Sequence, residues 1–387
     1  MEDYSRAGCY SGGDGRVPAR AAGPLDGELE RAVPRPFASV LIDTYNHERF
    51  IEQAIVSVME QDFPASEREI LVVDDGSADR TPELIRKFEP QVRLLRKANG
   101  GQASAFNAGI PECKGEIIAF LDGDDWWASG KLRKVARALS EDARCGIVGH
   151  GITNTFEDGS STLDATGKAE RLRLNSLAAA RVFRLRKSYL GTSRMTVRAR
   201  IARQILPVPE TLTIEADEYL FTLAAALSDL LIFPDVLTFY RQHGANLYNA
   251  AGGSAAGLRK KQSVMAALAD VLRRRLPACG VPADAVECTC EIIAAEAEQT
   301  RLILHGGAPW QTFRAENAIY RIMHEDAPRS HRIFRAATMI PALLLPPRWF
   351  YAGRRWLGAR TWYRRNRQKV LPAPKIASVA GAEEFKA

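Results

Sequence analysis

"FLDGDDWWASGKL", residues 120–132, places Asp122, Asp124 and Asp125 within four positions directly behind an apolar run. Carboxylates this close together repel one another, so the chain needs a reason to keep them. The run before them, 116–121, is rich in Ile, Phe and Leu and is typical of a buried strand. The acids therefore stand at a strand end, where open α/β sheets bind their ligands.

Strand and helix patterns alternate on both sides of this stretch. Further strands are predicted at 37–42, 69–73, 92–95 and 145–148, and helices at 50–61, 81–88 and 129–142. Such alternation predicts an α/β fold with a mainly parallel sheet flanked by helices. Residues 214–227 are also predicted to be a helix, and 230–241 a strand with its proline at an edge or bend.

Composition divides the chain into four parts. Residues 1–36 lack an early apolar stretch and are rich in Gly, Ala, Arg and Pro, which predicts a disordered leader. The α/β domain is predicted at 37–250, and a helical extension at 251–330 is expected to pack against it or on itself. A basic, aromatic-rich tail follows at 331–387. The six cysteines form no CxxC pair, so reduced thiols are expected rather than a disulfide framework or a zinc site.

The tail carries the basic charge of the chain. Residues 329–382 contain twelve Lys and Arg and no Asp or Glu, so the overall charge of +7 leaves about −5 for the rest. Its apolar core, 336–345, is too short to span a bilayer. Aromatic residues alternate with arginines: Trp349, Phe350, Tyr351, Trp356, Trp362 and Tyr363. This combination favours attachment to an anionic membrane surface, with a helix docked on the domain or an oligomer contact as alternatives. No nucleic-acid reader motif is present, so nucleic acid is not expected as a partner.

Polar residues follow four consecutive predicted strands. They lie in DTYNHE (43–48), DDGSADRT (74–81), KANGGQASAFNAGI (97–110) and DGDD (122–125). Each stretch alone could be a turn, but together on one sheet edge they favour a binding site. Three acids in four positions suit a divalent cation, Mg²⁺ or Mn²⁺, that bridges carboxylates to phosphates. The alternative is a solvated acidic turn before a helix anchored by tryptophan.

Four stretches in order resemble the nucleotide-sugar-binding half of family 2 glycosyltransferases, which have the GT-A fold. They are SVLIDTYNHERFIEQAIVSV, ILVVDDGSADRT, GGQASAFNAGI and IIAFLDGDDWW. The match is dense over 37–130 and looser to about 245, roughly half the chain. It implies an inverting transfer of a sugar from a nucleotide diphosphate sugar, with UDP expected, to an acceptor hydroxyl. The resemblance further implies cell-surface glycan synthesis on a glycan or lipid-linked acceptor, in the cytoplasm at the inner membrane face.

The resemblance also implies roles for single residues. Nucleotide contacts are expected from Thr44, Tyr45, Glu48, Asp75, Gly101, Gln102, Asn107, Asp122 and Arg241. Metal contacts are expected from Asp124 and Asp125 of the DXD-type motif and from His243. The general base is expected to be Asp217 in EADEYLF, with Glu215 and Glu218 as rivals. Acids at a helix start are also favoured by the helix dipole alone. Asp43 stands where the family often has proline.

Two other functions compete with this interpretation. Sugar nucleotidyltransferases also bring acids to a parallel sheet edge, but they usually show a glycine-rich phosphate loop that DTYNHE does not resemble. A non-catalytic binding module with the same fold is the other alternative, and the intact acids at 75, 122–125 and 217 argue against it. Processive synthases of the family carry a Gln-x-x-Arg-Trp motif and several membrane spans. The sequence shows neither, which favours a single-addition enzyme.

Overall fold

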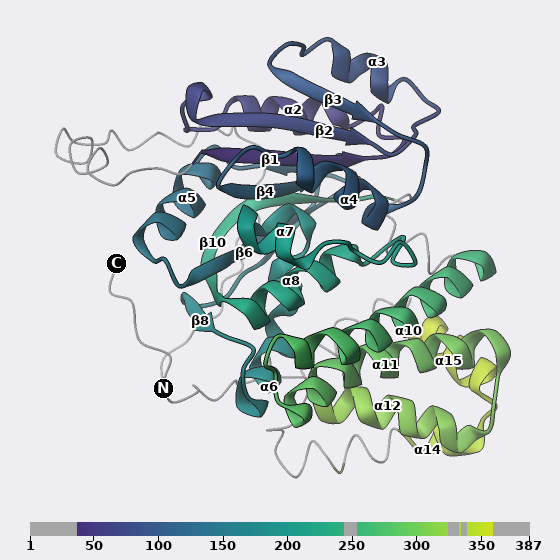
Figure 1. The fold of residues 1–387 in the computed structure, drawn as a ribbon. Helices are drawn as coiled ribbons and strands as arrows, with labels where there is room; N and C mark the ends of the chain where they lie inside the picture. The colour runs from purple at the N-terminus through teal and green to yellow at the C-terminus, as the bar shows by residue number, and fades with distance from the viewer. Residues whose placement is uncertain (1–36, 244–253, 324–332, 334–338, 359–387) are drawn as a thin grey trace, which may run out of the picture. The chain divides into compact units, whose positions relative to one another are not determined.

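Four parallel strands form the first half of a ten-stranded sheet in the computed structural model, which describes residues 37–243, 254–323, 333 and 339–358. The strands are β1 (Ala38–Thr44), β2 (Arg68–Asp74), β3 (Val92–Arg96) and β4 (Ile117–Asp122). They pair in the order β3-β2-β1-β4 (Figure 1). In this register Asp43 of β1 lies opposite Asp122 of β4. The carboxyl ends of the predicted strands thus meet at one edge, as expected.

The second half of the sheet is mixed. Its strands are β5 (Trp126–Trp127), β6 (Cys145–Phe156), β7 (Ser161–Asp164), β8 (Glu170–Leu172), β9 (Thr196–Arg198) and β10 (Asp229–Gln242). The order continues as β4-β9-β6-β10-β5; β6 and β10 are parallel, while β9 runs antiparallel to β4 and β6. The pairing of β10 with β6 shifts between Phe233 and Val236, around Pro234. The predicted bend at the proline is therefore confirmed.

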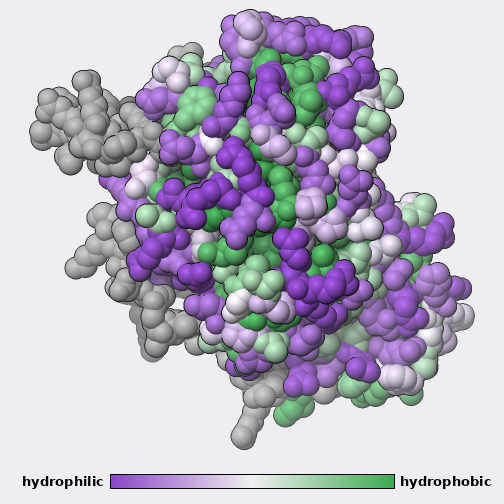
Figure 2. Space-filling model, in the orientation of Figure 1, coloured by the Kyte–Doolittle hydropathy of each residue, from purple (hydrophilic) through white to green (hydrophobic). Residues whose placement is uncertain are grey.

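Helices cover both faces of the sheet, which confirms the predicted layers. One face carries α2 (Ile51–Met59), α3 (Thr81–Arg86) and α5 (Lys131–Glu141); the other carries α4 (Gln102–Glu112), α7 (Ala199–Ile205) and α8 (Ala216–Leu227). Successive residues of a strand point to opposite faces, so Leu41 of β1 packs in one core and Ile42 in the other. Figure 2 shows that hydrophilic side chains cover most of the outer surface in this view.

The C-terminal third is helical, as predicted. It contains α10 (Ala255–Ala278), α11 (Ala283–His305) and α12 (Pro309–Met323), and α6 (Leu177–Arg186) from the middle of the chain packs against α11. Leu268 and Leu272 of α10 share one core with Tyr219 and Leu223 of α8. The helix that carries Asp217 therefore lies between the sheet and the helical region (Figure 1).

Two short helices end the described chain, α14 (Ile340–Leu344) and α15 (Pro347–Gly358). They pack on α11 and α12 through a small core that contains Ala342, Phe350 and Tyr351. No helix in the described part of the chain combines the length and the apolar character needed to cross a bilayer. The predicted leader, 1–36, and the tail beyond 358 lie outside the described residues.

The described chain also contains three 3₁₀ turns and five cysteines. Single 3₁₀ turns are η1 (Ala65–Glu67), η2 (Lys187–Leu190) and η3 (Thr192–Arg194). The five described cysteines are free, and all but Cys279 are buried.

Candidate active site

Four carboxylates from different elements gather at the carboxyl edge of the sheet. Asp43 is the last residue but one of β1, Asp122 ends β4, Asp124 lies two residues after it, and Asp217 lies in the first turn of α8. Burial raises the pKa of Asp43 to about 8, and the charges of Asp217 and Asp124 add to the effect. Burial raises the pKa of Asp122 well above its usual range, again with help from Asp43 and Asp124. The raised pKa values mean that these acids resist ionising together, and an added positive charge at the edge would favour their ionised forms.

One carboxylate oxygen at this edge lacks a partner. Among the described residues, nothing hydrogen-bonds to the buried Oδ1 of Asp43. A buried carboxylate oxygen without a donor is unfavourable, and a bound cation would relieve both this loss and the repulsion between the acids. The donor set at the edge fits a divalent cation for that reason. No group of three or more His, Cys, Asp or Glu side chains in the described part of the chain is arranged as a preformed metal site.

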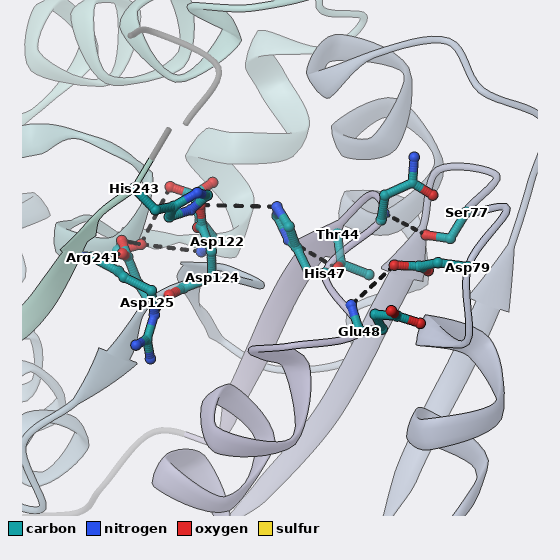
Figure 3. A network of polar contacts seen from close by, with 12 residues as sticks. Thr44, His47, Glu48, Ser77, Asp79, Asp122, Asp124, Asp125, Arg241 and His243 are labelled. Atoms are coloured by element: carbon teal, nitrogen blue, oxygen red, sulfur yellow. Dashed lines mark hydrogen bonds and ion pairs between the residues drawn. The ribbon is translucent and has the colours of Figure 1, made fainter. Parts of the chain in front are cut away.

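Two histidines converge on Asp124 (Figure 3). The Oδ2 atom of Asp124 lies 3.0 Å from His243 Nε2 and 3.8 Å from His47 Nε2. Burial alone would raise the pKa of Asp124, but the hydrogen bond with His243 and the charge of His47 lower it. The His47 ring is in turn fixed by Thr44, whose Oγ1 lies 3.1 Å from Nδ1. The expected pair of Asp124 and His243 is thus brought together, and His47 joins it although no sequence prediction named it.

Asp125 is oriented away from this pair by two hydrogen bonds. Its Oδ2 accepts from Ser193 Oγ at 2.6 Å, and its Oδ1 accepts from the backbone N of Arg241 at 2.9 Å. The Nε of Arg241 donates to the carbonyl oxygen of Asp124 at 2.9 Å, and its guanidinium lies over the rings of Phe50 and Trp126. Asp125 therefore joins the acidic turn to β10.

Ser193 belongs to a turn that is anchored from several sides. Its Oγ also lies 3.3 Å from Asp122 Oδ2. Its carbonyl oxygen accepts hydrogen bonds from Trp127 Nε1, Lys131 Nζ and Thr238 Oγ1, at 3.1, 2.7 and 2.7 Å. The buried Lys131 has a pKa well below its usual range because of desolvation. Such a network holds the 3₁₀ turn η3 in one position beneath the acids.

The neighbouring residue of the same turn holds Asp217. Thr192 donates to Asp217 Oδ2 from its backbone N at 3.0 Å and from its Oγ1 at 3.1 Å. Gln102 supports Thr192, because its Nε2 donates to Thr192 Oγ1 at 3.0 Å and its Oε1 accepts from Ala216 N at 3.0 Å. Burial raises the pKa of Asp217, although the Thr192 bonds oppose that rise.

Glu218 and Glu215, the two alternative candidates for the general base, lie in different surroundings from Asp217. Glu218 is buried and its Oε1 lies 2.5 Å from Lys187 Nζ, so an ion pair holds it inside the protein. Glu215 has a left-handed backbone, with φ of 59°, and burial raises its pKa to about 8. The charge of Asp217 is among the causes that raise the pKa values of Asp43 and Asp122. Consecutive residues of η3 bind Asp217 and Asp122, so Asp217 is held close to the acids of the sheet edge.

Asp75 shapes the loop that follows β3. Its carboxylate accepts hydrogen bonds from Gly100 N at 3.0 Å, Gly101 N at 2.6 Å and Lys97 Nζ at 2.7 Å. Gly101 has φ of 82°, and a Cβ there would come within 2.8 Å of the Thr213 backbone. The loop is thus wrapped closely around Asp75 beside the ends of β2 and β3.

The other residues predicted to contact the nucleotide either lie along the same sheet edge or form hydrogen bonds that hold neighbouring elements together. Tyr45 directly follows β1 at this sheet edge, and its side chain is 42% exposed. The backbone N of Glu48 donates to Asp79 Oδ2 at 3.1 Å (Figure 3), and Glu48 Oε2 accepts from the backbone N of Arg80 at 3.2 Å, so the first two loops are joined. The side-chain amide of Asn107 forms two hydrogen bonds of 2.8 Å with the backbone of Val208. Asn107 and Gln102 therefore use their amides to fasten α4 to its neighbours.

A cavity of about 300 Å³ adjoins Arg241. Arg49, Phe50, Thr155, Phe156, Glu157, Gly159 and Arg241 line it. Both guanidiniums lie against the Phe50 ring, at 5.1 Å for Arg49 and 4.6 Å for Arg241. The cavity extends the edge toward β6 and offers positive charge next to the negative cluster.

The sequence of this chain is similar to those of known glycosyltransferases. The sequence profile of "Glycosyl transferase family 2" matches residues 39–205. An uncharacterised glycosyltransferase of Nostoc sp. is 30% identical over 223 residues, which cover 56% of this chain and 68% of that protein. Poly(ribitol-phosphate) beta-N-acetylglucosaminyltransferase TarS of Staphylococcus aureus is 34% identical over 107 residues, or 27% of this chain and 19% of TarS.

A solved structure shares the fold. The crystal structure of S. aureus TarS superposes with a TM-score of 0.50 at 20% identity, over 76% of this chain and 49% of that chain. The chain thus spans about half the length of the TarS structure and about a fifth of the TarS sequence.

Proposed function

This chain belongs to glycosyltransferase family 2 and has the GT-A fold, and from that premise we propose that it is an inverting enzyme that moves a sugar from a UDP-sugar to an acceptor hydroxyl. One observation carries the proposal. Asp217 accepts two hydrogen bonds from Thr192, and the next residue, Ser193, contacts Asp122 at the carboxyl edge of the sheet. The proposed base is thereby held close to the acids of the proposed donor site.

Asp217 is the proposed general base. It would accept the proton of the acceptor hydroxyl while that oxygen forms a bond to the anomeric carbon and the bond from this carbon to the diphosphate breaks. A raised pKa suits this role, because a carboxylate with a higher pKa is a stronger base. Glu218 is a poorer candidate since Lys187 already holds it.

The donor site is proposed at the ends of β1, β2 and β4. Thr44, Tyr45 and Asp75 with the loop at Gly101 would lie against the nucleotide, and Asp122 against its ribose. Arg241 would offer positive charge to the phosphates from the opposite side of Asp124. The TarS relative is named for poly(ribitol-phosphate), and we propose a glycan or lipid-linked acceptor at a cell surface for this chain.

A divalent cation, Mn²⁺ or Mg²⁺, is part of the proposal. Asp124 and His243 are the residues that would hold it, with His47 beside them. Both Asp125 oxygens already accept hydrogen bonds, from Ser193 and Arg241, so we propose that Asp125 fixes the turn. When bound, the cation supplies positive charge against the diphosphate and against the repelling acids.

The experiment has a binding arm and a turnover arm. Titration calorimetry with UDP, GDP and dTDP, each with and without Mn²⁺, is expected to show Mn²⁺-dependent binding of UDP. Asp124→Ala should weaken that binding. Asp217→Asn should leave it intact while lowering UDP release from UDP-sugars by about 10²- to 10⁴-fold, the usual contribution of a general base.

A matched control is available on the surface. Asp158 lies on the exposed turn between β6 and β7, and Asp158→Asn should change neither binding nor turnover. Unchanged turnover in Asp217→Asn would refute the base. Binding without turnover in the wild-type protein, for any UDP-sugar and extracted acceptor, would favour the non-catalytic module instead.

The proposed place of action is the cytoplasmic face of the inner membrane, with the protein attached from outside the bilayer. A lipid-linked acceptor would be reached there.

A further inference from the structure

The hairpin of α14 and α15 has two apolar faces. The inner face packs against Leu302 and Ala315 through Met339, Ala342, Phe350 and Tyr351. The outer face, called the hairpin surface below, remains open to solvent. It consists of Ile340, Leu343, Leu344, Leu345 and Trp349, with exposed fractions of 53, 45, 72, 39 and 73%.

The clustering of these side chains is unusual. Single exposed apolar residues are common on soluble proteins, but this group falls within ten consecutive positions. Contiguous apolar surface of this kind marks contact with a partner or a membrane. Because the inner face already satisfies the packing of the hairpin, the hairpin surface is not needed for the core.

Charge indicates which partner fits. Arg348 lies between Leu345 and Trp349 and is exposed, with its Nη2 bonded to the carbonyl oxygen of Leu304 at 2.8 Å. The sequence around the hairpin, 329–382, has twelve basic residues and no acid. An apolar strip with exposed Arg348 next to Trp349, in a stretch of sequence rich in basic residues, matches the anionic headgroup layer of a bilayer.

We propose that the hairpin surface rests on an anionic lipid bilayer, with Leu344 and Trp349 as its main apolar anchors. The apolar side chains enter the boundary between headgroups and acyl chains, and Arg348 stays at the lipid phosphates. Figure 1 shows α14 and α15 beside α11 and α12, at the end of the helical region away from β1–β3. The proposal rests on residues remote from Asp217, so it can fail while the proposed reaction stands.

Flotation of the full chain with vesicles tests it. The protein should float with vesicles of equal parts phosphatidylcholine and phosphatidylglycerol, and far less with phosphatidylcholine alone or at high salt. The double substitution Leu344→Ser with Trp349→Ser should lower the bound fraction about tenfold or more, because each large apolar side chain contributes on that scale. Circular dichroism and the midpoint of thermal unfolding check that this variant keeps its fold.

Leu163 supplies the matched control. It is 75% exposed on β7 and has no part in the hairpin, so Leu163→Ser should float like the wild type. Equal flotation of the double variant and the wild type would overturn the proposal, as would failure of the wild type to float on anionic vesicles. Light scattering provides the remaining test: a dimer that the double variant loses would identify a second copy, not a bilayer, as the occupant.

Discussion

One oxygen of Asp217 receives both hydrogen bonds that Thr192 can donate. The backbone N and the Oγ1 of Thr192 lie 3.0 and 3.1 Å from Oδ2, and the next residue, Ser193, binds Asp125. Two consecutive side chains therefore set the position of the proposed base relative to the acidic turn. Thr192 acts through Asp217 and is a positioning residue.

Thr192→Val tests this role through the pH profile. The hydrogen bonds of Thr192 lower the pKa of Asp217 against the effect of burial, so loss of the hydroxyl should raise that pKa further. The base must be ionised, and kcat/KM should fall about tenfold at acidic pH and recover toward the wild-type value at alkaline pH. Thr192→Ser keeps the hydroxyl and should keep the wild-type profile.

A merely structural role would give another result. Damage to the fold would lower kcat/KM by the same factor at every pH, with no displacement of the acidic limb. The acids around Asp217, which are Asp43, Asp122, Glu215 and Glu218, stay in place in both variants. Equal profiles for Thr192→Val and the wild type would rule out the positioning role.

Local sequence predicts some of these residues and not others. Asp122, Asp124 and Asp217 stand in short stretches with a strand or helix beside them, so their place at the edge follows from neighbours in the chain. Thr192 and Ser193 have partners 25 and 68 positions away, and no periodic pattern surrounds them. His47 lies within a predicted loop, but its approach to Asp124 depends on the pairing of β1 with β4.

At the scale of elements, buried parallel strands were the easiest to predict. β1, β2 and β4 are near-continuous apolar runs between polar loops, whereas β3 is shorter and partly exposed; the predicted bounds of all four lie within two residues of the observed ones. Strand β9 has three residues, too few for a pattern, and it separates β4 from β6. The mixed half of the sheet therefore could not be foreseen from periodicity.

Helix α4 packs closely on the sheet because of one glycine. A Cβ at Gly109 would lie 2.5 Å from Leu41 Cδ1 and 2.8 Å from Val73 Cγ2, both in the core. Gly109→Ala should therefore lower the free energy of unfolding by about 1–3 kcal/mol, despite the better helix propensity of alanine. Urea denaturation followed by circular dichroism measures the difference.

Gly353 of α15 is the matched control. No atom lies within 4 Å of a Cβ built there, so Gly353→Ala should stabilise the helix by up to about 1 kcal/mol. If Gly109→Ala behaved the same way, the contact of α4 with Leu41 would not be as close as described.

At the scale of the whole molecule, one core crosses the predicted boundary near residue 250. Val264, Met265, Leu268, Leu272 and Leu276 of α10 are buried in the cluster that contains Tyr219 of α8. Each such side chain contributes about 1.5–3 kcal/mol, so together they match the net stability of a typical protein. The helical extension thus packs against the α/β domain, which is one of the two arrangements expected from the sequence.

Truncation tests this continuity. A chain of residues 37–250 should lose cooperative thermal unfolding and aggregate, because α8 would expose the face that packs against α10. A chain of residues 37–323 retains α10, α11 and α12 and should unfold cooperatively. Calorimetry of the two chains decides the point, and cooperative unfolding of the shorter chain would mean that the sheet domain is self-sufficient.

The buried thiols have a practical consequence for labelling. Burial raises the pKa of Cys113 to about 12, of Cys145 to about 11 and of Cys290 to about 12, so hardly any of the reactive thiolate forms. Burial also raises the pKa of Cys279, but this residue is only half-buried where α10 ends, so it is the cysteine of the described residues that a maleimide dye reaches most easily. A fluorophore attached there would report on the junction of α10 and α11 without any substitution in the described chain.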